Sequence, residues 1–91
     1  MKKVRMRVSG RVQGVGFRFL TKMAADRLGI KGIVRNEHDG SIYIEAIGAE
    51  DVLEDFISLI KGSPSPSGRV DECDIIYDDA IKERTSFDVT Y

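Results

Sequence analysis

The sequence predicts an α+β sandwich, in which one antiparallel sheet carries two helices on the same face. Stretches of alternating apolar and polar residues indicate strands, and two stretches with apolar residues every three or four positions indicate helices. These elements follow one another as β-α-β-β-α-β, with one more short strand at the end. A chain of 91 residues holds only one hydrophobic core, so we expect one domain over residues 1–91.

The first half of the chain predicts a strand, a helix and a second strand. The first strand is indicated by apolar residues at alternate positions, Val4, Met6 and Val8. A glycine-rich stretch, residues 10–16, interrupts it. From residue 18 to residue 28 the apolar positions take helical spacing, and they are Leu20, Met23, Ala24 and Leu28. Gly29 is a natural helix end, and residues 30–36 predict the second strand.

The second half predicts two strands around a helix, and then a short last strand. Residues 38–40 contain Asp-Gly, which favours a tight turn. Residues 41–47 form the third strand, with one apolar face made of Ile42, Ile44 and Ala46. The second helix is indicated by Val52, Leu53, Phe56, Ile57 and Ile60. A loop at 62–68 precedes a fourth strand at 70–77, and residues 86–91 predict the fifth.

This order of elements is that of a ferredoxin-like sandwich. Right-handed crossovers place the first and third strands in the centre, flanked by the second and fourth, and the edge taken by the fifth strand stays open. The first and second strands run in the same direction on either side of the third. Their C-terminal ends are therefore roughly 10 Å apart at one end of the sandwich. We expect the glycine-rich stretch and Asn36 to be neighbours there.

Composition argues against several classes of protein. The formal net charge is -1, whereas a general nucleic-acid binder needs a basic excess. No apolar run is long enough to cross a bilayer, and the charged residues 1–5 are not followed by the apolar segment of a signal peptide. The lone Cys73 leaves no internal disulfide and fits a reducing compartment. We expect a cytoplasmic monomer that binds neither nucleic acid nor a membrane.

The segment from Gly10 to Arg18 has the parts of a phosphate-binding loop. Gly14 and Gly16 permit backbone conformations in which successive N–H groups face one concavity. The helix that follows adds the positive potential of its N-terminus. Arg18 supplies a planar fork that can hold a phosphate through two hydrogen bonds. Together these parts predict an anion site for phosphate.

The residues around this loop limit the chemistry. The loop has no Gly-Lys-Ser/Thr of a nucleotide P-loop, no cysteine nucleophile, and no nearby carboxylate cluster for a metal. An unactivated phosphate ester is hard to cleave in this way. An acyl phosphate has a good carboxylate leaving group, so electrostatic stabilisation and a positioned water can suffice. Asn36 is not a strong base, but its amide can orient water.

Two segments resemble the acylphosphatase family. Residues 10–18 are similar to its signature, Gly-x-Val-Gln-Gly-Val-x-Phe-Arg, and residues 32–36 are similar to its second segment, which continues with Asp39-Gly40 and Gly48. The match extends over essentially the whole chain, to the closing Phe87-x-Val89-x-Tyr91. Two features depart from the pattern. Ile33 stands where the family usually has an aromatic residue, and the loop at 62–68 is rich in serine.

The resemblance implies a hydrolase acting on acid anhydrides, which converts an acyl phosphate to a carboxylate and inorganic phosphate without metal or cofactor. It implies that Arg18 and the loop amides bind the phosphoryl group and that Asn36 orients the nucleophilic water. The substrate's own phosphate is then the proton acceptor, and inorganic phosphate is expected to inhibit competitively. The candidate substrate-binding residues are Gln13, Gly14, Val15, Gly16, Phe17 and Thr21.

Several residues have plainer interpretations. Thr21 either helps to order Arg18 and the loop or is an ordinary helix residue. Gln13 is expected to shape the loop rather than to take part in chemistry. His38, the only histidine, lies in a predicted turn and is expected to be solvated rather than a general base. Cys73 is expected to be a small apolar residue of a strand rather than a nucleophile.

Two other functions stay open at this point. Residues 14–19 resemble the aromatic RNA-contact motif of RRM domains, although they open a helix and do not lie on a central strand. A catalytically silent relative that binds phosphate or acyl phosphates would carry the same motifs. The sequence does not indicate which acyl phosphate is the physiological substrate.

Overall fold

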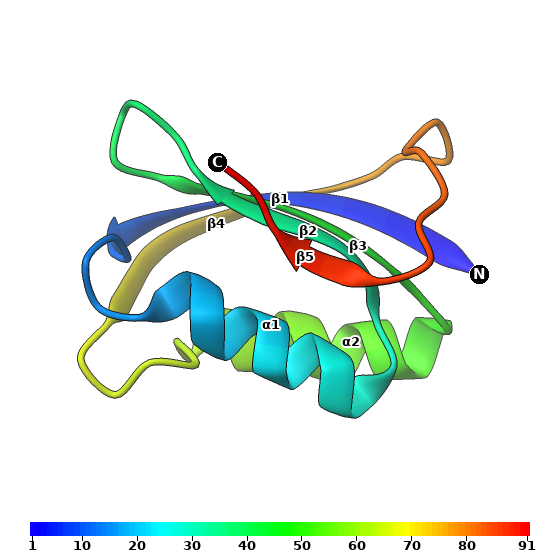
Figure 1. The fold of residues 1–91 in the computed structure, drawn as a ribbon, viewed down its shortest axis with the longest axis horizontal. Helices are drawn as coiled ribbons and strands as arrows, with labels where there is room; N and C mark the ends of the chain where they lie inside the picture. Colours follow the sequence, from blue (N-terminus) through cyan, green and yellow to red (C-terminus); the bar gives the residue numbers. More distant parts are fainter.

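The computed structural model describes residues 1–91, with a five-stranded sheet in one layer and two helices in the other (Figure 1). In chain order, the elements are β1 (Lys2–Arg11), α1 (Phe17–Leu28), β2 (Lys31–Asn36), β3 (Ile42–Gly48), α2 (Glu50–Lys61), β4 (Arg69–Tyr77) and β5 (Phe87–Val89). Both helices lie on the same face of the sheet, as predicted. Neither helix has the length and apolar composition needed to cross a lipid bilayer.

The strand order in the sheet is β4-β1-β3-β2-β5. The four strands that pair as predicted are antiparallel, whereas β5 runs parallel to β2 and makes the sheet mixed. The edge that was left open for the fifth strand is therefore the outer side of β2. Two further backbone hydrogen bonds hold it there: Gly32 N–H donates to Ser86 O at 3.0 Å, and Thr90 N–H donates to Val34 O at 2.9 Å.

The core lies between the sheet and the helices, and it confirms the predicted faces of three elements. The alternating residues of β1 and β3 are buried, and they are Val4, Met6, Val8, Ile42, Ile44 and Ala46. The face of α2 that covers them consists of Leu53, Phe56, Ile57 and Ile60, and Val52, which was also predicted, is half-buried against the core. Phe56 packs edge-on against Phe87 of β5, with 6.0 Å between the ring centroids. Each large side chain buried here contributes about 1.5–3 kcal/mol to folding.

The buried face of α1 differs in part from the predicted one. It consists of Phe17, Thr21, Ala24 and Ala25, whereas Met23, which was predicted to face the core, is 48% exposed. The helix also begins one residue earlier than predicted. Small residues at 24 and 25 allow α1 to approach β2, β5 and α2 closely. Met is more hydrophobic than Ala, so a prediction based on hydrophobicity puts Met23 in the core. The predicted face is therefore turned about the helix axis relative to the observed one.

The loop after β1 is shorter than the glycine-rich stretch suggested. β1 continues through a bulge between Ser9 and Gly10 and ends at Arg11. Gly10 has φ 132°, and a Cβ there would lie 2.3 Å from the carbonyl oxygen of Arg69 on β4. Gly10 is therefore a strand residue in close contact with its neighbour, and the loop itself covers only residues 12–16. At the other end of the chain β5 stops at Val89, short of the predicted residue 91.

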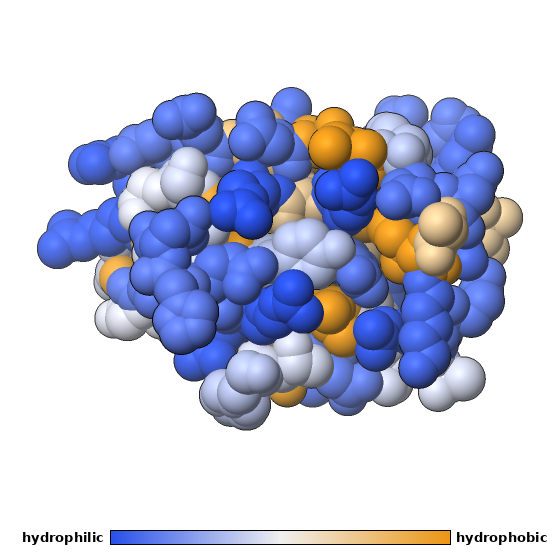
Figure 2. Space-filling model, turned by 90° about the horizontal axis from the view of Figure 1, so that it is seen from above, coloured by the Kyte–Doolittle hydropathy of each residue, from blue (hydrophilic) through white to orange (hydrophobic).

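The second face of the sheet is left uncovered by the helices and is largely hydrophilic (Figure 2). The charged side chains that β1 presents here are paired with carboxylates. Arg5 Nε lies 3.3 Å from Asp78 Oδ2, and Arg7 Nη1 lies 2.9 Å from Asp39 Oδ2. These pairs join β1 to the segments that follow β4 and β2.

Candidate active site

The ends of β1 and β2 meet at one end of the sheet, as predicted. In the strand register, Val8 of β1 and Asn36 of β2 are both paired with Ile42 of β3, from opposite sides. Val8 and Asn36 are thus separated by two strand spacings, roughly 10 Å. β1 ends three residues later, at Arg11, so the topology brings the loop at residues 12–16 to the same end of the sheet as Asn36.

The loop has the backbone geometry of an anion nest. Gly14 and Gly16 have φ values of 75° and 78°, whereas φ of Val15 between them is not positive. This alternation turns successive N–H groups toward one side. A Cβ at either glycine would meet no atom within 4 Å, so glycine is needed here for its φ and not for space. The N–H groups of all three residues donate to no acceptor in the protein.

Helix α1 adds further free donors. Gly16 is its N-cap residue, and no side chain caps this end. The first intrahelical hydrogen bond runs from Leu20 N–H to Gly16 O at 3.1 Å, so the N–H groups of residues 17–19 remain free. No acidic residue occupies the first turn. The positive end of the helix dipole therefore faces the loop unneutralised.

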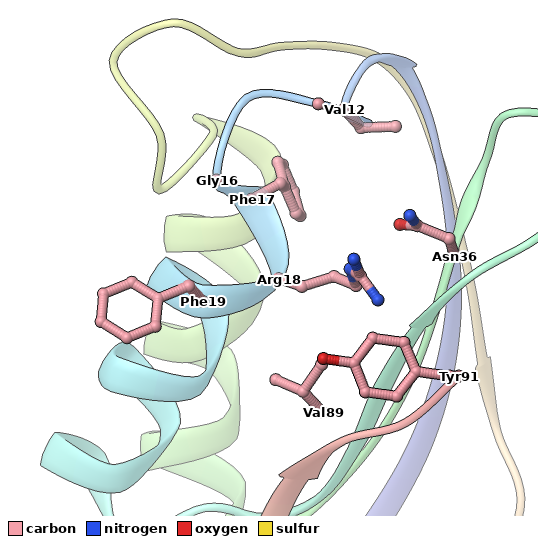
Figure 3. A pocket seen from close by; sticks show the side chains of 9 residues that line it. Val12, Gly16, Phe17, Arg18, Phe19, Asn36, Val89 and Tyr91 are labelled. Atoms are coloured by element: carbon pink, nitrogen blue, oxygen red, sulfur yellow. The ribbon is translucent and has the colours of Figure 1, made fainter.

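A pocket of about 260 Å³ opens between the loop, the start of α1 and the ends of β2 and β5 (Figure 3). Arg18 reaches into it from α1, toward Asn36 on the opposite wall. The residues that line it are Val12, Gly14, Gly16, Phe17, Arg18, Phe19, Asn36, Val89 and Tyr91. The two residues predicted to carry the chemistry thus share one cavity.

The guanidinium group of Arg18 is held by an aromatic ring and by no carboxylate. Its Cζ lies 4.9 Å from the centroid of the Tyr91 ring, and Arg18 takes part in none of the salt bridges of the molecule. A cation–π contact of this kind stabilises the side chain by about 0.5–1 kcal/mol at an exposed site. Because the ring accepts no strong hydrogen bond, the N–H groups of Arg18 stay available for an anion.

Asn36 faces the same cavity from the last position of β2. Strand alternation puts its side chain on the helix side of the sheet, together with the buried Val34. Its side-chain oxygen Oδ1 is buried and accepts no hydrogen bond. Leaving such an acceptor unpaired costs about 1–3 kcal/mol.

Gln13 does not line the pocket but ties its two walls together. The side-chain Nε2 donates to Glu37 O and to Ser41 O, both at 2.9 Å. These two carbonyl groups flank the turn between β2 and β3, which is closed by a bond from Glu37 N–H to Ser41 O at 2.8 Å. The expectation that Gln13 shapes the loop agrees with these contacts.

The other predicted substrate-binding residues are divided between the pocket and its support. Gly14, Gly16 and Phe17 line the cavity. The side chain of Val15 packs instead against the core. Thr21 is completely buried one turn into α1, its Oγ1 has no hydrogen-bond partner, and it is not among the lining residues.

His38 and Cys73 both lie outside the cavity. His38 is exposed in the turn after β2, as predicted. Cys73 is half-buried on β4 and packs at the edge of the core, and burial raises the pKa of its thiol. A thiol with a raised pKa is a poor nucleophile at neutral pH. No three His, Cys, Asp or Glu side chains come together anywhere in the chain in an arrangement that could hold a metal ion.

Four lining residues were not identified from the sequence: Val12, Phe19, Val89 and Tyr91. Val12 and Phe19 adjoin the glycine motif, and this proximity was the only signal available for them. Val89 and Tyr91 reach the site because β5 pairs with β2, and the sequence did not indicate that pairing. The segment with an RRM-like pattern, residues 14–19, occupies the loop and the first turn of α1 rather than a central strand.

Comparisons with known proteins show the family to which the chain belongs. The acylphosphatase family model matches residues 4–89. The acylphosphatase of Enterococcus faecalis is 58% identical over 89 residues, which cover 98% of each chain. The acylphosphatase of Ligilactobacillus salivarius is 48% identical over the full length of both chains. The crystal structure of acylphosphatase from Bacillus subtilis superimposes with a TM-score of 0.95 over 100% of both chains, at 35% sequence identity. Because the family model and these relatives match nearly the whole length, the chain belongs to the acylphosphatase family.

Proposed function

We propose that the chain hydrolyses the carboxyl–phosphate bond of acyl phosphates by holding the phosphoryl group between Arg18 and the loop amides while Asn36 directs a water at phosphorus. One observation carries this proposal. Arg18 and Asn36 face each other across a pocket that is also lined by Gly14, Gly16 and Phe17, whose backbone N–H groups are free. A phosphoryl group carries negative charge on three oxygens, and these donors match that charge from several directions.

The reaction needs little beyond this arrangement. The water oxygen forms a bond to phosphorus, and the bond from phosphorus to the acyl oxygen breaks. The bonding electron pair leaves with the carboxylate, and the water proton passes to an oxygen of the phosphoryl group. Arg18 and the amides stabilise the charge of the phosphoryl oxygens throughout. Asn36 places the water in line, which removes the entropic cost of its approach.

The side chains that line the pocket favour an activated phosphate as the substrate. They include no Ser, Cys, His, Asp or Glu, and their one hydroxyl group belongs to Tyr91, whose ring lies against Arg18, so no activated nucleophile and no strong base faces the phosphoryl group. Expulsion of an alkoxide would require an acid to protonate it, whereas a carboxylate leaves unprotonated at neutral pH. Acyl phosphates therefore fit this set of residues better than phosphate esters do.

We further infer that the chain acts as a cytoplasmic monomer of one domain, and that inorganic phosphate competes with the substrate. The pocket is complete within one chain, which supports a monomer. Cys73 is a free thiol, which agrees with a reducing compartment. Inorganic phosphate presents the same oxygens as the transferred group, so it should occupy the same donors. Gel filtration tests whether the chain is a monomer, and inhibition kinetics with inorganic phosphate test the competition.

Turnover of benzoyl phosphate in the presence of a metal chelator tests the proposed function. We expect hydrolysis well above the spontaneous rate, and no comparable hydrolysis of glycerol phosphate, whose leaving group is an alkoxide. Absence of benzoyl phosphate turnover would refute the enzymatic proposal. If phosphate still bound in that case, the chain would be a binding protein of the same fold.

A further inference from the structure

The serine-rich loop between α2 and β4 touches the back of the phosphate-binding loop. Ser65 Oγ donates a hydrogen bond of 2.6 Å to the carbonyl oxygen of Val15. Ser65 is only 3% exposed, although it lies in a loop of polar residues. This contact joins residues fifty positions apart in the sequence. It is also the only hydrogen bond that a side chain makes to residues 14–16.

The geometry of the peptide bond gives this contact its consequence. A trans peptide is planar, so the C=O of Val15 and the N–H of Gly16 point in opposite directions. Ser65 fixes the carbonyl on the side away from the pocket. The N–H of Gly16 is thereby directed to the other side, where Gly16 lines the cavity and has no acceptor in the protein.

We propose that Ser65 is a positioning residue for phosphate binding, because its hydrogen bond to Val15 O keeps the amide of Gly16 aimed at the phosphoryl group. Glycine accepts either sign of φ, so the peptide between Val15 and Gly16 has little intrinsic resistance to flipping. A flipped peptide would present a carbonyl oxygen, and not an N–H group, to the anion. The inference rests on the proposed function, since it concerns the same phosphate site.

The loop that carries Ser65 is itself rigidly built. Ser63 is the only non-glycine residue with positive φ, at 65°. Its hydroxyl donates to Ser65 O at 2.8 Å and accepts from Ser65 N–H at 3.2 Å. Gly68 N–H also donates to Ser65 O, at 3.0 Å. A left-handed serine costs about 1–2 kcal/mol, so the loop maintains an unfavourable backbone conformation in order to present Ser65 as it does.

The same loop is packed closely against the phosphate-binding loop. A Cβ placed on Gly68 would lie 3.1 Å from Arg11 O and 3.4 Å from Val15 Cγ2. No water layer fits between surfaces at these distances. Without the Ser65 hydroxyl, Val15 O would therefore be left without a donor on that side, and turning toward the pocket would give it access to solvent.

Ser65→Ala tests the proposal, with Ser67→Ala as its matched control. Ser67 lies two positions away, is exposed and makes no side-chain hydrogen bond. We expect Ser65→Ala to raise the Kd for inorganic phosphate and the KM for benzoyl phosphate together, by roughly tenfold, which is the loss of one hydrogen bond to a charged group. The kcat should change much less, because the bond to the phosphoryl group is present in both the ground state and the transition state.

A second measurement separates positioning from a general loss of structure. In ¹H–¹⁵N spectra the Gly16 amide of the wild-type protein should shift on phosphate titration, and in Ser65→Ala that shift should be largely lost. Ser65→Thr keeps a hydroxyl and should restore both the shift and the Kd. A Ser65→Ala variant that binds phosphate as tightly as Ser67→Ala, with the Gly16 shift intact, would overturn the proposal.

The phosphate titration also distinguishes this inference from the proposed function. A wild-type protein that binds phosphate but does not hydrolyse benzoyl phosphate would refute the enzymatic proposal, and the effect of Ser65 on the Kd would still be measured. A wild-type protein that binds no phosphate would refute the inference about Ser65, and if it also failed to hydrolyse benzoyl phosphate, both proposals would be refuted.

Discussion

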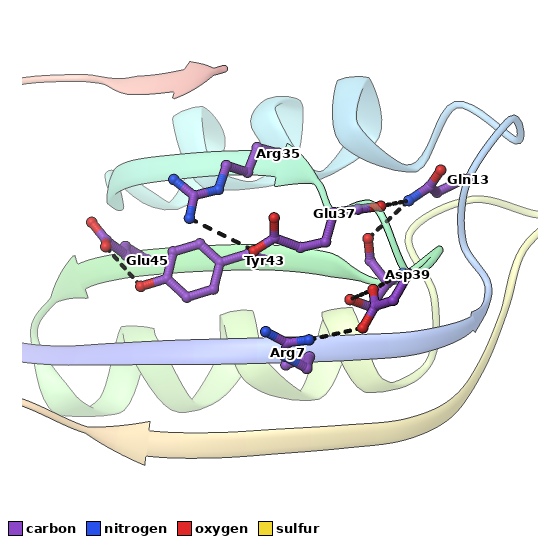
Figure 4. Close-up of polar contacts among 8 residues, drawn as sticks. Arg7, Gln13, Arg35, Glu37, Asp39, Tyr43 and Glu45 are labelled. Atoms are coloured by element: carbon purple, nitrogen blue, oxygen red, sulfur yellow. Dashed lines mark hydrogen bonds and ion pairs between the residues drawn. The ribbon is translucent and has the colours of Figure 1, made fainter. Parts of the chain in front are cut away.

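Gln13 and Glu37 are joined by a hydrogen bond of 2.9 Å, from the side-chain Nε2 of Gln13 to the backbone carbonyl of Glu37 (Figure 4). The same amide group donates its second N–H to Ser41 O at 2.9 Å, so both of its donors are used. Glu37 directly follows Asn36. One side chain of the loop after β1 therefore fixes the position of Asn36 on the opposite wall of the pocket.

Removing this amide should impair turnover more than it impairs phosphate binding. Gln13→Ala leaves two carbonyl groups without their donor and should lower the free energy of unfolding by about 1–2 kcal/mol. The backbone around Asn36 is then free to move, so the kcat for benzoyl phosphate should fall by at least about tenfold, since a small misplacement of a reacting group is costly. The Kd for phosphate should change by less than about threefold. An unchanged kcat would contradict the role of Gln13 in placing Asn36.

A second variant turns this contact into a pH switch. In Gln13→Glu a carboxylate would face two carbonyl oxygens, and only its protonated form could donate to one of them. The kcat of this variant relative to wild type should therefore rise as pH falls from 8 toward 5. A ratio that is independent of pH would show that the contact does not control turnover.

Substitutions of Arg18 and Asn36 should differ in their effects on phosphate binding and on catalysis. Arg18→Ala removes the charged fork, so phosphate inhibition should be lost and kcat/KM should fall by about a hundredfold or more. Asn36→Ala removes only the group that we propose orients water. Its kcat should fall by about a hundredfold, while its Kd for phosphate stays within about threefold of wild type. Calorimetric titration with phosphate measures both affinities, and an equal loss in the two variants would refute this division of roles.

Tyr91 should affect Arg18 through the aromatic contact alone. Tyr91→Phe keeps a ring at 4.9 Å from the guanidinium group and should leave the KM for benzoyl phosphate unchanged. Tyr91→Leu removes the ring and with it a cation–π contact that stabilises the position of Arg18 by about 0.5–1 kcal/mol. The KM should therefore rise by about two- to fivefold. Equal KM values for the two variants would show that the ring does not hold Arg18 in its binding position.

The placement of Arg18 and Asn36 in one cavity could be predicted because it depends on strand order and on residue types with specific chemistry. The position of Tyr91 could not, since it depends on which edge β5 takes. That choice follows from the irregular segment before β5, which is anchored by a hydrogen bond from Lys3 Nζ to Ile81 O and has no periodic pattern.

The contacts of Ser65 and Gln13 could not be predicted from the sequence for a different reason. Each of these side chains bonds to backbone carbonyl groups, and every residue type carries such a group. The residue that contributes the carbonyl group can therefore be of any type, and the sequence does not indicate which residue accepts the hydrogen bond. The apolar faces of β1 and α2 were predicted correctly because burial selects residue type directly. The prediction for the buried face of α1 was partly wrong because close packing of a helix favours small residues over large ones.

Two glycines should differ sharply in their tolerance of alanine. Gly32 has φ 151°, and a Cβ there would lie 1.8 Å from Glu45 O on β3, so Gly32→Ala must displace the strand backbone. We expect a loss of at least about 3 kcal/mol in the free energy of unfolding. Gly29, the C-cap of α1, has φ 73° and open space around it, so Gly29→Ala should cost only about 1–2 kcal/mol. Urea denaturation measures both, and equal losses would contradict the contact across β2 and β3.

Tyr43 should make the stability of the protein fall at alkaline pH. Its hydroxyl donates to Glu45 Oε2 at 2.8 Å, and its ring lies 4.6 Å from Arg35 Cζ on the uncovered face of the sheet. Burial, followed by the hydrogen bond and the charge of Glu45, raises the pKa of Tyr43 to about 12. A tyrosine in an unfolded chain has a pKa of about 10.

The sign of the effect follows from these two values. Between pH 10 and pH 12 the unfolded chain releases the Tyr43 proton while the folded chain keeps it, so rising pH favours unfolding. The stability from this group is fully present below pH 10 and is lost as pH approaches 12. Tyr43→Phe cannot release a proton, and near neutral pH it should be less stable by about 1 kcal/mol because Glu45 loses a donor. The difference in unfolding free energy between wild type and variant should therefore shrink from pH 9 to pH 11.5. A difference that stays constant over this range would show that Tyr43 ionises equally in both states.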